Sequence, residues 1–318
     1  MPINNEADNK NSERLAKVLG NVLLQSANES VVISQLEAFG YFSPMPADLP
    51  LKSGGMLLKK LDKLTELICG VPKLILVKED NPGVYRYDPY AEAAIRESLV
   101  VFRRARNSVA RTHLYLIGSE MLNKNPDFLI PSGSADLDRA VLRQTVERFW
   151  EHAETSYIRL ASFWDRVGQI LDFVFFNVRQ YEKDSFVSVL DRVNANFVPI
   201  SKTFSKQLAW KRLWRFHNSE QTNGLKWLLR RRNLLVHSLH LSPPIKSEQE
   251  NPLLCYMHNH IEAKVGLKLK PGTPEQELKL IHCHLAQAAN LFEDAVDIAI
   301  AGVNLCKGGE KAYVDYEE

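Results

Sequence analysis

The residues best suited to chemistry are Arg232, Asn233 and His237, which lie on one apolar, helix-like run of the chain. The imidazole of His237 can accept or donate a proton near neutral pH. The guanidinium of Arg232 is a permanent cation whose planar N–H groups match phosphate oxygens. The amide of Asn233 can orient either group through hydrogen bonds. These residue types together predict the handling of a phosphodiester such as RNA.

The spacing of the three residues constrains how they could act together. Asn233 and His237 are four positions apart and share one helical face. Arg232 and His237 are five apart and lie about 140° around the helix axis from each other. Three arrangements could bring them together: the arginine reaches around the helix, the last turn loosens, or a second copy of the helix supplies the complementary group.

The segment before these residues is strongly basic. Between Ser201 and Arg232 the only acidic residue is Glu220, and tryptophans are interleaved with the cations. Such local charge predicts a polyanionic partner. The alternative is a solvated basic face with core tryptophans beneath it. The cations are Lys202, Lys206, Lys211, Arg212, Arg215, Lys226, Arg230, Arg231 and Arg232.

The pattern Arg232-Asn233-x-x-x-His237 resembles the signature of the HEPN superfamily (higher eukaryotes and prokaryotes nucleotide-binding). That signature is an arginine followed after four to six residues by a histidine. The stretch from Phe163 to Phe173 looks like the central helix of the bacterial Cthe-type HEPN subgroup. The resemblance covers residues 90–306 as architecture and leaves residues 1–90 unexplained.

The resemblance implies a metal-independent endoribonuclease that needs no cofactor and acts as a homodimer, with both motifs lining one composite cleft. Its catalytic residues would be Arg232, Asn233 and His237. His237 would transfer the proton, Arg232 would stabilise charge on the phosphorus, and Asn233 would orient the histidine or bind phosphate.

By the same resemblance, the neighbouring residues Lys226, Arg230 and Arg231 would hold the RNA backbone, and Trp227 could stack on a base. Core packing is the alternative for Trp227, and simple solvation is the alternative for Arg230 and Arg231.

The biological setting implied by analogy is a toxin or antiviral defence effector, with an antitoxin or other protein as a possible partner. Some HEPN toxins carry a tyrosine shortly after the histidine, which a partner enzyme modifies. Here Ser238, Leu239 and His240 follow instead, so that form of neutralisation is not expected.

An arginine followed after four to six residues by a histidine also occurs at Arg212 to His217 and at Arg106 to His113. The third match differs in having Asn233 and an apolar Leu-Leu-Val between its polar ends.

Three other functions compete with the nuclease. A HEPN protein that has lost catalysis would serve as an RNA-binding or dimerising scaffold. Cys255-x-x-His258 has a spacing acceptable for zinc, but His282 and His284 on one helix would point to opposite sides, so we expect no metal site. A winged-helix DNA-binding regulator would need a base-reading helix, whereas residues 56–68 offer only lysines.

The elements expected to position these residues are mostly helices. We predict a mainly α protein with an accessory domain over residues 1–90, a HEPN-like helical bundle over 91–306 and a loose tail over 307–318. The predicted accessory domain holds helices at 13–25, 31–39 and 56–68 and a hairpin at 74–87. The predicted bundle helices are 91–121, 137–178 with a kink or break near Thr155-Ser156, 186–197, 204–216, 224–241 and 274–305. Residues 253–269 could form a second hairpin, and Thr273 and Pro274 begin the last helix.

Composition sets the broad class. The chain has 318 residues, of which 45% are hydrophobic and 25% charged, with a formal net charge of +2. No apolar run is long enough to cross a bilayer, and the first residues lack a signal-peptide core. We therefore expect a cytoplasmic protein with no membrane contact. The four cysteines form no CxxC pair and predict reduced thiols.

Overall fold

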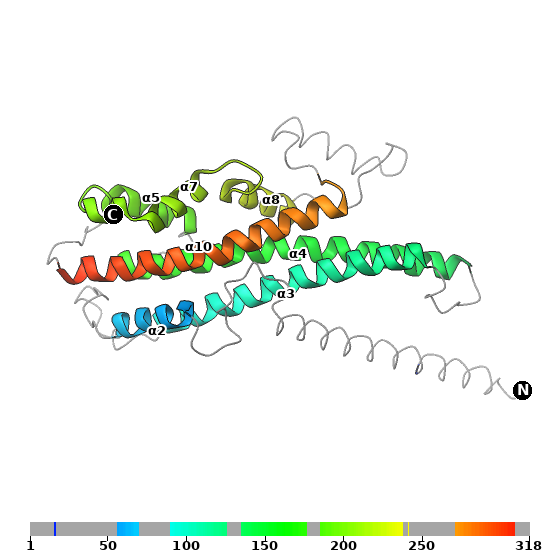
Figure 1. The fold of residues 1–318 in the computed structure, drawn as a ribbon, viewed down its shortest axis with the longest axis horizontal. Helices are drawn as coiled ribbons and strands as arrows, with labels where there is room; N and C mark the ends of the chain where they lie inside the picture. Colours follow the sequence, from blue (N-terminus) through cyan, green and yellow to red (C-terminus); the bar gives the residue numbers. More distant parts are fainter. Residues whose placement is uncertain are drawn as a thin grey trace, which may run out of the picture. The chain divides into compact units, whose positions relative to one another are not determined.

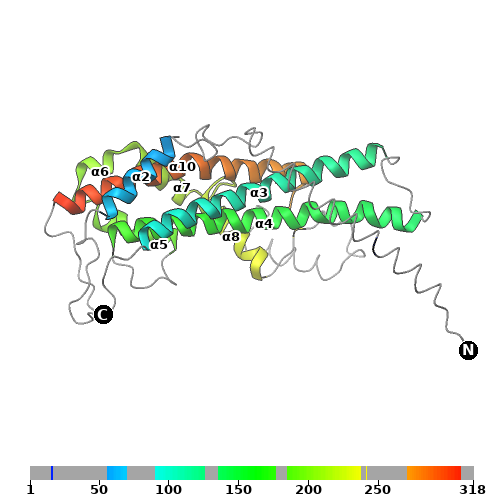
Figure 2. The same cartoon turned by 90° about the horizontal axis from the view of Figure 1, so that it is seen from below.

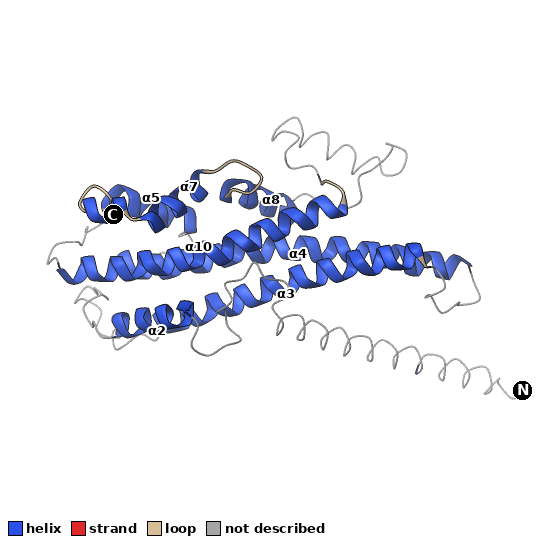
Figure 3. Cartoon of the chain, viewed as in Figure 1, coloured by secondary structure: helices blue, strands red, loops and turns tan. Residues whose placement is uncertain are grey.

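The computed structural model describes residues 16, 56–69, 90–125, 135–176, 185–237, 241 and 271–308. Every regular element in these ranges is an α-helix, which confirms the predicted mainly α class (Figure 3). The chain divides into two compact units, residues 1–42 and 43–318, and all the helices below belong to the second. Apart from residue 16, which is helical, the predicted helices at 13–25 and 31–39 and both predicted hairpins lie outside the described residues.

Three long helices form the centre of this unit: α3 (Tyr90–Lys124), α4 (Ala135–Phe175) and α10 (Pro274–Gly308). They lie side by side in both views (Figures 1 and 2), and α4 contacts both of the others. Their shared core contains one phenylalanine from each helix. The ring of Phe163 on α4 lies 5.1 Å from Phe102 of α3 and 5.1 Å from Phe292 of α10. All three rings are almost completely buried, as expected for the main hydrophobic core.

The long helix α4 continues through Thr155 and Ser156, so the break considered there is not present. Both residues bond their hydroxyls to backbone carbonyls one turn earlier. Thr155 Oγ1 donates to Glu151 O at 2.8 Å, and Ser156 Oγ donates to His152 O at 2.7 Å. Because these bonds use the second lone pair of each carbonyl, the hydroxyls are satisfied without interrupting the helix.

The helix α2 (Met56–Cys69) confirms the predicted helix at 56–68. Although we assigned it to the accessory domain, it packs against α10 and α3. Lys60 on its surface donates to Glu293 at 2.6 Å and to Asp297 at 2.9 Å, both on α10. The structure therefore places this segment with the bundle helices.

Four shorter helices contact the long ones: α5 (Phe186–Asn196), α6 (Lys202–Lys206), α7 (Leu208–Asn218) and α8 (Leu225–His237). Helices α5 and α8 pack on α4, and α7 packs on α10 (Figures 1 and 2). The single helix predicted at 204–216 is wrong. It is divided at Gln207, whose backbone is extended with φ −61° and ψ 134°.

The predicted start of the last helix is confirmed. Thr273 N–H donates to Gln276 Oε1 at 3.0 Å, and Gln276 N–H donates to Thr273 Oγ1 at 3.4 Å. This reciprocal capping box satisfies two backbone N–H groups that a helix start leaves free. No helix in the described part of the chain is both long enough and apolar enough to cross a membrane.

Candidate functional site

The residues predicted to carry the chemistry lie on α8, an amphipathic helix whose buried face includes a charged residue. Its buried face carries Leu228, Leu235 and also the cation Arg231. Its exposed face ends in Asn233, Val236 and His237, and Val236 is 49% exposed. Since successive residues are 100° apart, the three consecutive arginines point in three different directions. Each of them therefore has a separate role.

Arg231 is held inside the bundle by Glu277 at the start of α10. Its Nη2 donates to Glu277 Oε1 at 2.7 Å, and the two residues are 2% and 3% exposed. Tyr157 Oη on α4 donates to the other carboxylate oxygen at 2.6 Å, and Gly272 N–H donates to Oε1 at 2.9 Å. Burial, together with the charge of Glu277, raises the pKa of Tyr157 well above its ordinary value. This buried polar cluster ties α8 to α4 and α10.

The cluster changes the interpretation of Arg231. We predicted that it contacts the RNA backbone, but its guanidinium lies among buried side chains. It sits 5.4 Å from the ring centroid of Tyr157 and 5.5 Å from that of Trp227. A phosphate could reach it only if α8 left the bundle. We therefore assign Arg231 to the positioning of α8 and not to substrate binding.

Trp227, for which we considered base stacking, also lies in the core. It is 3% exposed and stacks on His284 of α10 with centroids 5.4 Å apart and planes 14° apart. His284 Nε2 lies 2.9 Å from the carbonyl of Thr222, and burial lowers its pKa to about 4. The ring is therefore neutral near pH 7, and the bond to a carbonyl assigns the proton to Nε2. Trp227 takes the core-packing role that was its alternative.

The remaining motif residues, Arg232, Asn233 and His237, reach the surface. Arg232 is half-buried at the edge of the exposed face, and its Nη1 donates to Asn233 Oδ1 at 3.0 Å. His237 is the last residue of α8 and is exposed. The structure therefore brings Arg232 and Asn233 together. Within one chain, helix geometry keeps His237 about 140° around the axis from Arg232.

An acidic residue that our sequence analysis missed lies close to the motif. Asp165 on α4 is half-buried and accepts a hydrogen bond from the N–H of Phe186, the first residue of α5. Burial raises the pKa of Asp165, while the positive charges of Arg232 and Arg166 oppose the rise. Arg232 thus has an amide oxygen on its own helix and a carboxylate on α4 in its surroundings. The signal in the sequence was a lone carboxylate between the core residues Trp164 and Val167.

Lys226 and Arg230, also predicted to contact RNA, share one acidic neighbour. Arg230 Nη2 lies 3.4 Å from Glu220 Oε1, and Lys226 Nζ lies 3.9 Å from the same oxygen. Arg230 and Glu220 are exposed, so these ion pairs contribute little to stability. A polyanion can displace such a contact at small cost, and both cations stay available at the surface.

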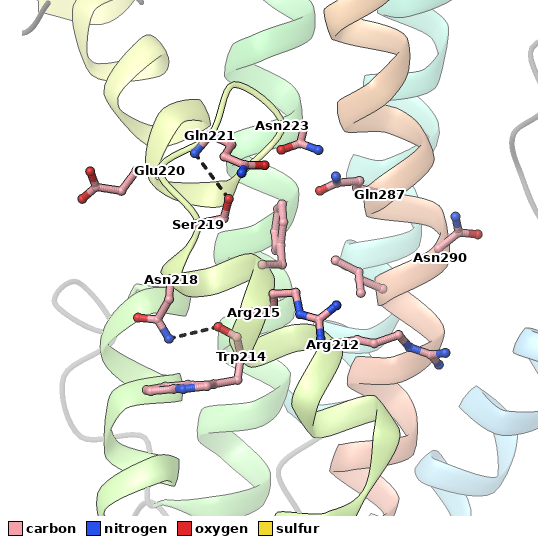
Figure 4. A pocket seen from close by; sticks show the side chains of 12 residues that line it. Arg212, Trp214, Arg215, Asn218, Ser219, Glu220, Gln221, Asn223, Gln287 and Asn290 are labelled. Carbon is pink, nitrogen blue, oxygen red and sulfur yellow. Dashed lines mark hydrogen bonds between the residues drawn. The ribbon is translucent and has the colours of Figure 1, made fainter.

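A pocket of about 780 Å³ opens beside the start of α8 (Figure 4). Figure 4 shows the amides of Asn223 and Gln287 at one end and the guanidiniums of Arg212 and Arg215 at the other. Arg212 is already engaged, because its Nε donates to Asp294 at 2.7 Å and its Nη2 also binds that carboxylate. Arg215 is exposed. The lining residues are Arg212, Trp214, Arg215, Phe216, Asn218, Ser219, Glu220, Gln221, Asn223, Gln287, Asn290 and Leu291.

The two other arginine–histidine spacings have structural roles. His217 is buried and stacks on Trp214 with centroids 4.8 Å apart, while Arg212 pairs with Asp294. Arg106 is buried in α3 at 2% exposure. Of the three matches, the one on α8 is alone in having its histidine exposed at the end of a helix.

A metal site was one of the less favoured alternatives to the nuclease. Within the described ranges, no three or more His, Cys, Asp or Glu side chains gather as a zinc site with three or four protein ligands would require. His282 and His284 do face opposite ways, since His284 is buried beneath Trp227 while His282 meets His113 of α3. Cys255 and His258 lie outside the described residues.

Comparisons with protein-family models, with curated proteins and with solved structures found no match for this chain. The class of protein is therefore defined here by its fold, a mainly α bundle. Its function has to be argued from the site alone.

Proposed function

We propose that this chain is a metal-independent endoribonuclease of HEPN type that cleaves RNA at the exposed end of α8. The observation that carries the proposal is the arrangement of Arg232. Its guanidinium is bonded to Asn233 at the surface and lies in the field of Asp165, next to a helix end where His237 is exposed. Because this guanidinium is already held in place, it loses little conformational freedom when it binds a phosphate.

The chemistry needs only groups that the chain supplies. The 2′-hydroxyl oxygen of a ribose attacks the adjacent phosphorus and forms the new P–O bond, and its proton passes to a general base. The P–O bond to the 5′-oxygen breaks, and that oxygen takes a proton from a general acid. His237 acts as one of these two groups, and Arg232 stabilises the extra negative charge on the phosphate oxygens. The products are a 2′,3′-cyclic phosphate and a 5′-hydroxyl.

Two copies of α8 complete the site. Along one helix, Arg232 and His237 are about 7.5 Å apart in rise as well as turned away from each other. If two protomers pack through the face that holds Asn233 and Val236, the arginine of one approaches the histidine of the other. The exposed valine at the centre of this face supports such contact, because it gains from removal from water. A symmetric pair is the commonest way to build it.

Lys226, Arg230 and the pocket extend this proposed site toward the start of α8. From Leu225, the first residue of α8, the helix rises about 10 Å to Arg232. Arg215 can bind a phosphate there, and the amides of Asn223 and Gln287 can bond base edges. A toxin or defence role, and an antitoxin partner, follow only if the nuclease activity is found.

The test compares the wild type, His237→Ala and Arg232→Ala on a mixed RNA pool in the presence of EDTA. We expect the wild type to leave 2′,3′-cyclic phosphates and each variant to lose at least a hundredfold in rate. Arg103→Ala, an exposed arginine on α3, is the matched control and keeps full activity. Equal cleavage by the wild type and His237→Ala would refute the proposal.

A mixture of the two inactive variants tests the shared site. If one protomer supplies Arg232 and the other His237, a heterodimer of the two variants has one intact site and one inactive site. About half of the dimers in an equal mixture are heterodimers, so about a quarter of the wild-type activity returns. No recovery would mean that each chain uses its own pair. RNA that is bound but never cut by the wild type would favour the scaffold alternative.

A further inference from the structure

A pair of histidines joins α3 to α10 away from the motif on α8. His113 Nδ1 and His282 Nε2 are 3.4 Å apart, and their rings meet edge to face with centroids 5.6 Å apart. Both residues are half-buried and belong to long helices of the central bundle. The two side chains are therefore carried by regular helices and are partly accessible to solvent.

A metal ion binds the neutral imidazole through a ring nitrogen. A neutral imidazole has one nitrogen with a free lone pair and one that carries the proton. In each ring, one tautomer presents the lone pair on the nitrogen that faces the other histidine.

The separation of the two nitrogens allows a long hydrogen bond without a metal ion and shared coordination with one. N–H hydrogen bonds usually span about 2.7–3.2 Å, so 3.4 Å is long for one. Two imidazole nitrogens bound to one tetrahedral ion at about 2.0–2.1 Å lie about 3.3–3.4 Å from each other. The helices would not have to move to bind such an ion.

We propose that His113 and His282 bind a late first-row divalent ion such as Zn²⁺, Ni²⁺ or Cu²⁺, which cross-links α3 and α10. Imidazole ligands select this class, and Cu²⁺ is held most tightly of the three. Water fills the remaining positions, since both side chains border solvent. Mg²⁺ and Ca²⁺ are excluded because they prefer oxygen ligands. The site is separate from the motif on α8, and this proposal does not depend on RNA cleavage.

The experiment uses the full chain, stripped of metal with a chelator and then dialysed. Ions bound per chain are counted by Zn²⁺ titration, and the melting temperature is recorded with and without Zn²⁺. The variants are His113→Gln and His282→Gln, which keep size and polarity, and the matched control is His152→Gln on α4, which stacks on Tyr115. Other histidines that bind Zn²⁺ contribute equally to all four proteins and cancel in the differences.

We expect the wild type and the His152→Gln variant to bind one Zn²⁺ more than either ligand variant. Their melting temperature should rise by several degrees at a concentration that leaves both ligand variants unchanged. Loss of one ligand should weaken the site at least tenfold, and Mg²⁺ should shift none of the proteins. The same ion count in wild type and both ligand variants would overturn the proposal, as would loss in only one of them.

Discussion

The buried pair of Arg231 and Glu277 makes the sharpest prediction about stability. Glu277→Gln removes the negative charge but keeps the volume, which leaves the Arg231 guanidinium buried beside a neutral amide. Breaking a buried ion pair in this way costs about 3–5 kcal/mol. Tyr157 Oη and Gly272 N–H also donate to this carboxylate, each to a different oxygen. Glutamine has only one side-chain oxygen, so at least one of these two donors loses its acceptor. We therefore expect a loss at the upper end of that range.

A second variant separates charge burial from packing. The double substitution Arg231→Met with Glu277→Met removes both charges and fills similar space with apolar side chains. Such replacements are often neutral or stabilising, so the double variant should recover the free energy that the unpaired guanidinium costs, although Tyr157 Oη and Gly272 N–H remain without their acceptor. Urea unfolding followed by circular dichroism measures both values. A loss below about 1 kcal/mol in the single variant, or an equal loss in both variants, would refute the role given to this pair.

Further predictions concern a buried histidine and two helical glycines. Burial lowers the pKa of His284 to about 4. Between about pH 6.5 and 4 the unfolded chain therefore binds a proton that the folded chain does not. The free energy of unfolding should fall by about 3 kcal/mol as the pH drops through this range. Urea midpoints at pH 7, 6 and 5 should show this slope, and His284→Phe should flatten it; an unchanged slope would place the titration elsewhere. Gly168→Ala should cost about 1–3 kcal/mol, because the new Cβ would lie 2.7 Å from Phe186 Cα. Gly118→Ala, whose Cβ would meet nothing within 4 Å, should instead stabilise by about 0.5–1 kcal/mol, and equal effects of the two changes would contradict the packing argument.

Hydrophobic periodicity was enough to predict most of the described helices. The segments at 56–68, 91–121, 186–197 and 274–305 are helices with ends within a few residues of those expected. The division at Gln207 was missed because the apolar spacing continues through it from Phe204 to Trp210. Helix α8 ends at His237 and Leu241 is not helical, so the predicted end at 241 was too late.

The candidate site was predictable only in part. A helical projection of α8 already places Arg231 with Leu228 and Leu235, and this could have separated it from Arg230 and Arg232. The partner of Arg231, Glu277, could not be predicted from the sequence. It is 46 positions away, and the contact depends on how α8 packs on α4 and α10. The same tertiary packing brings Asp165 near Arg232.

The run Arg230-Arg231-Arg232 also limits how the chain can be studied by mutation. Alanine replacement of the whole run is a common way to erase a basic surface, but here it would delete one solvent-facing cation, one motif cation and one internal anchor together. Loss of RNA binding after such a change would report unfolding as readily as lost recognition. Charge-reversal scans of this helix are informative only when residue 231 is left intact.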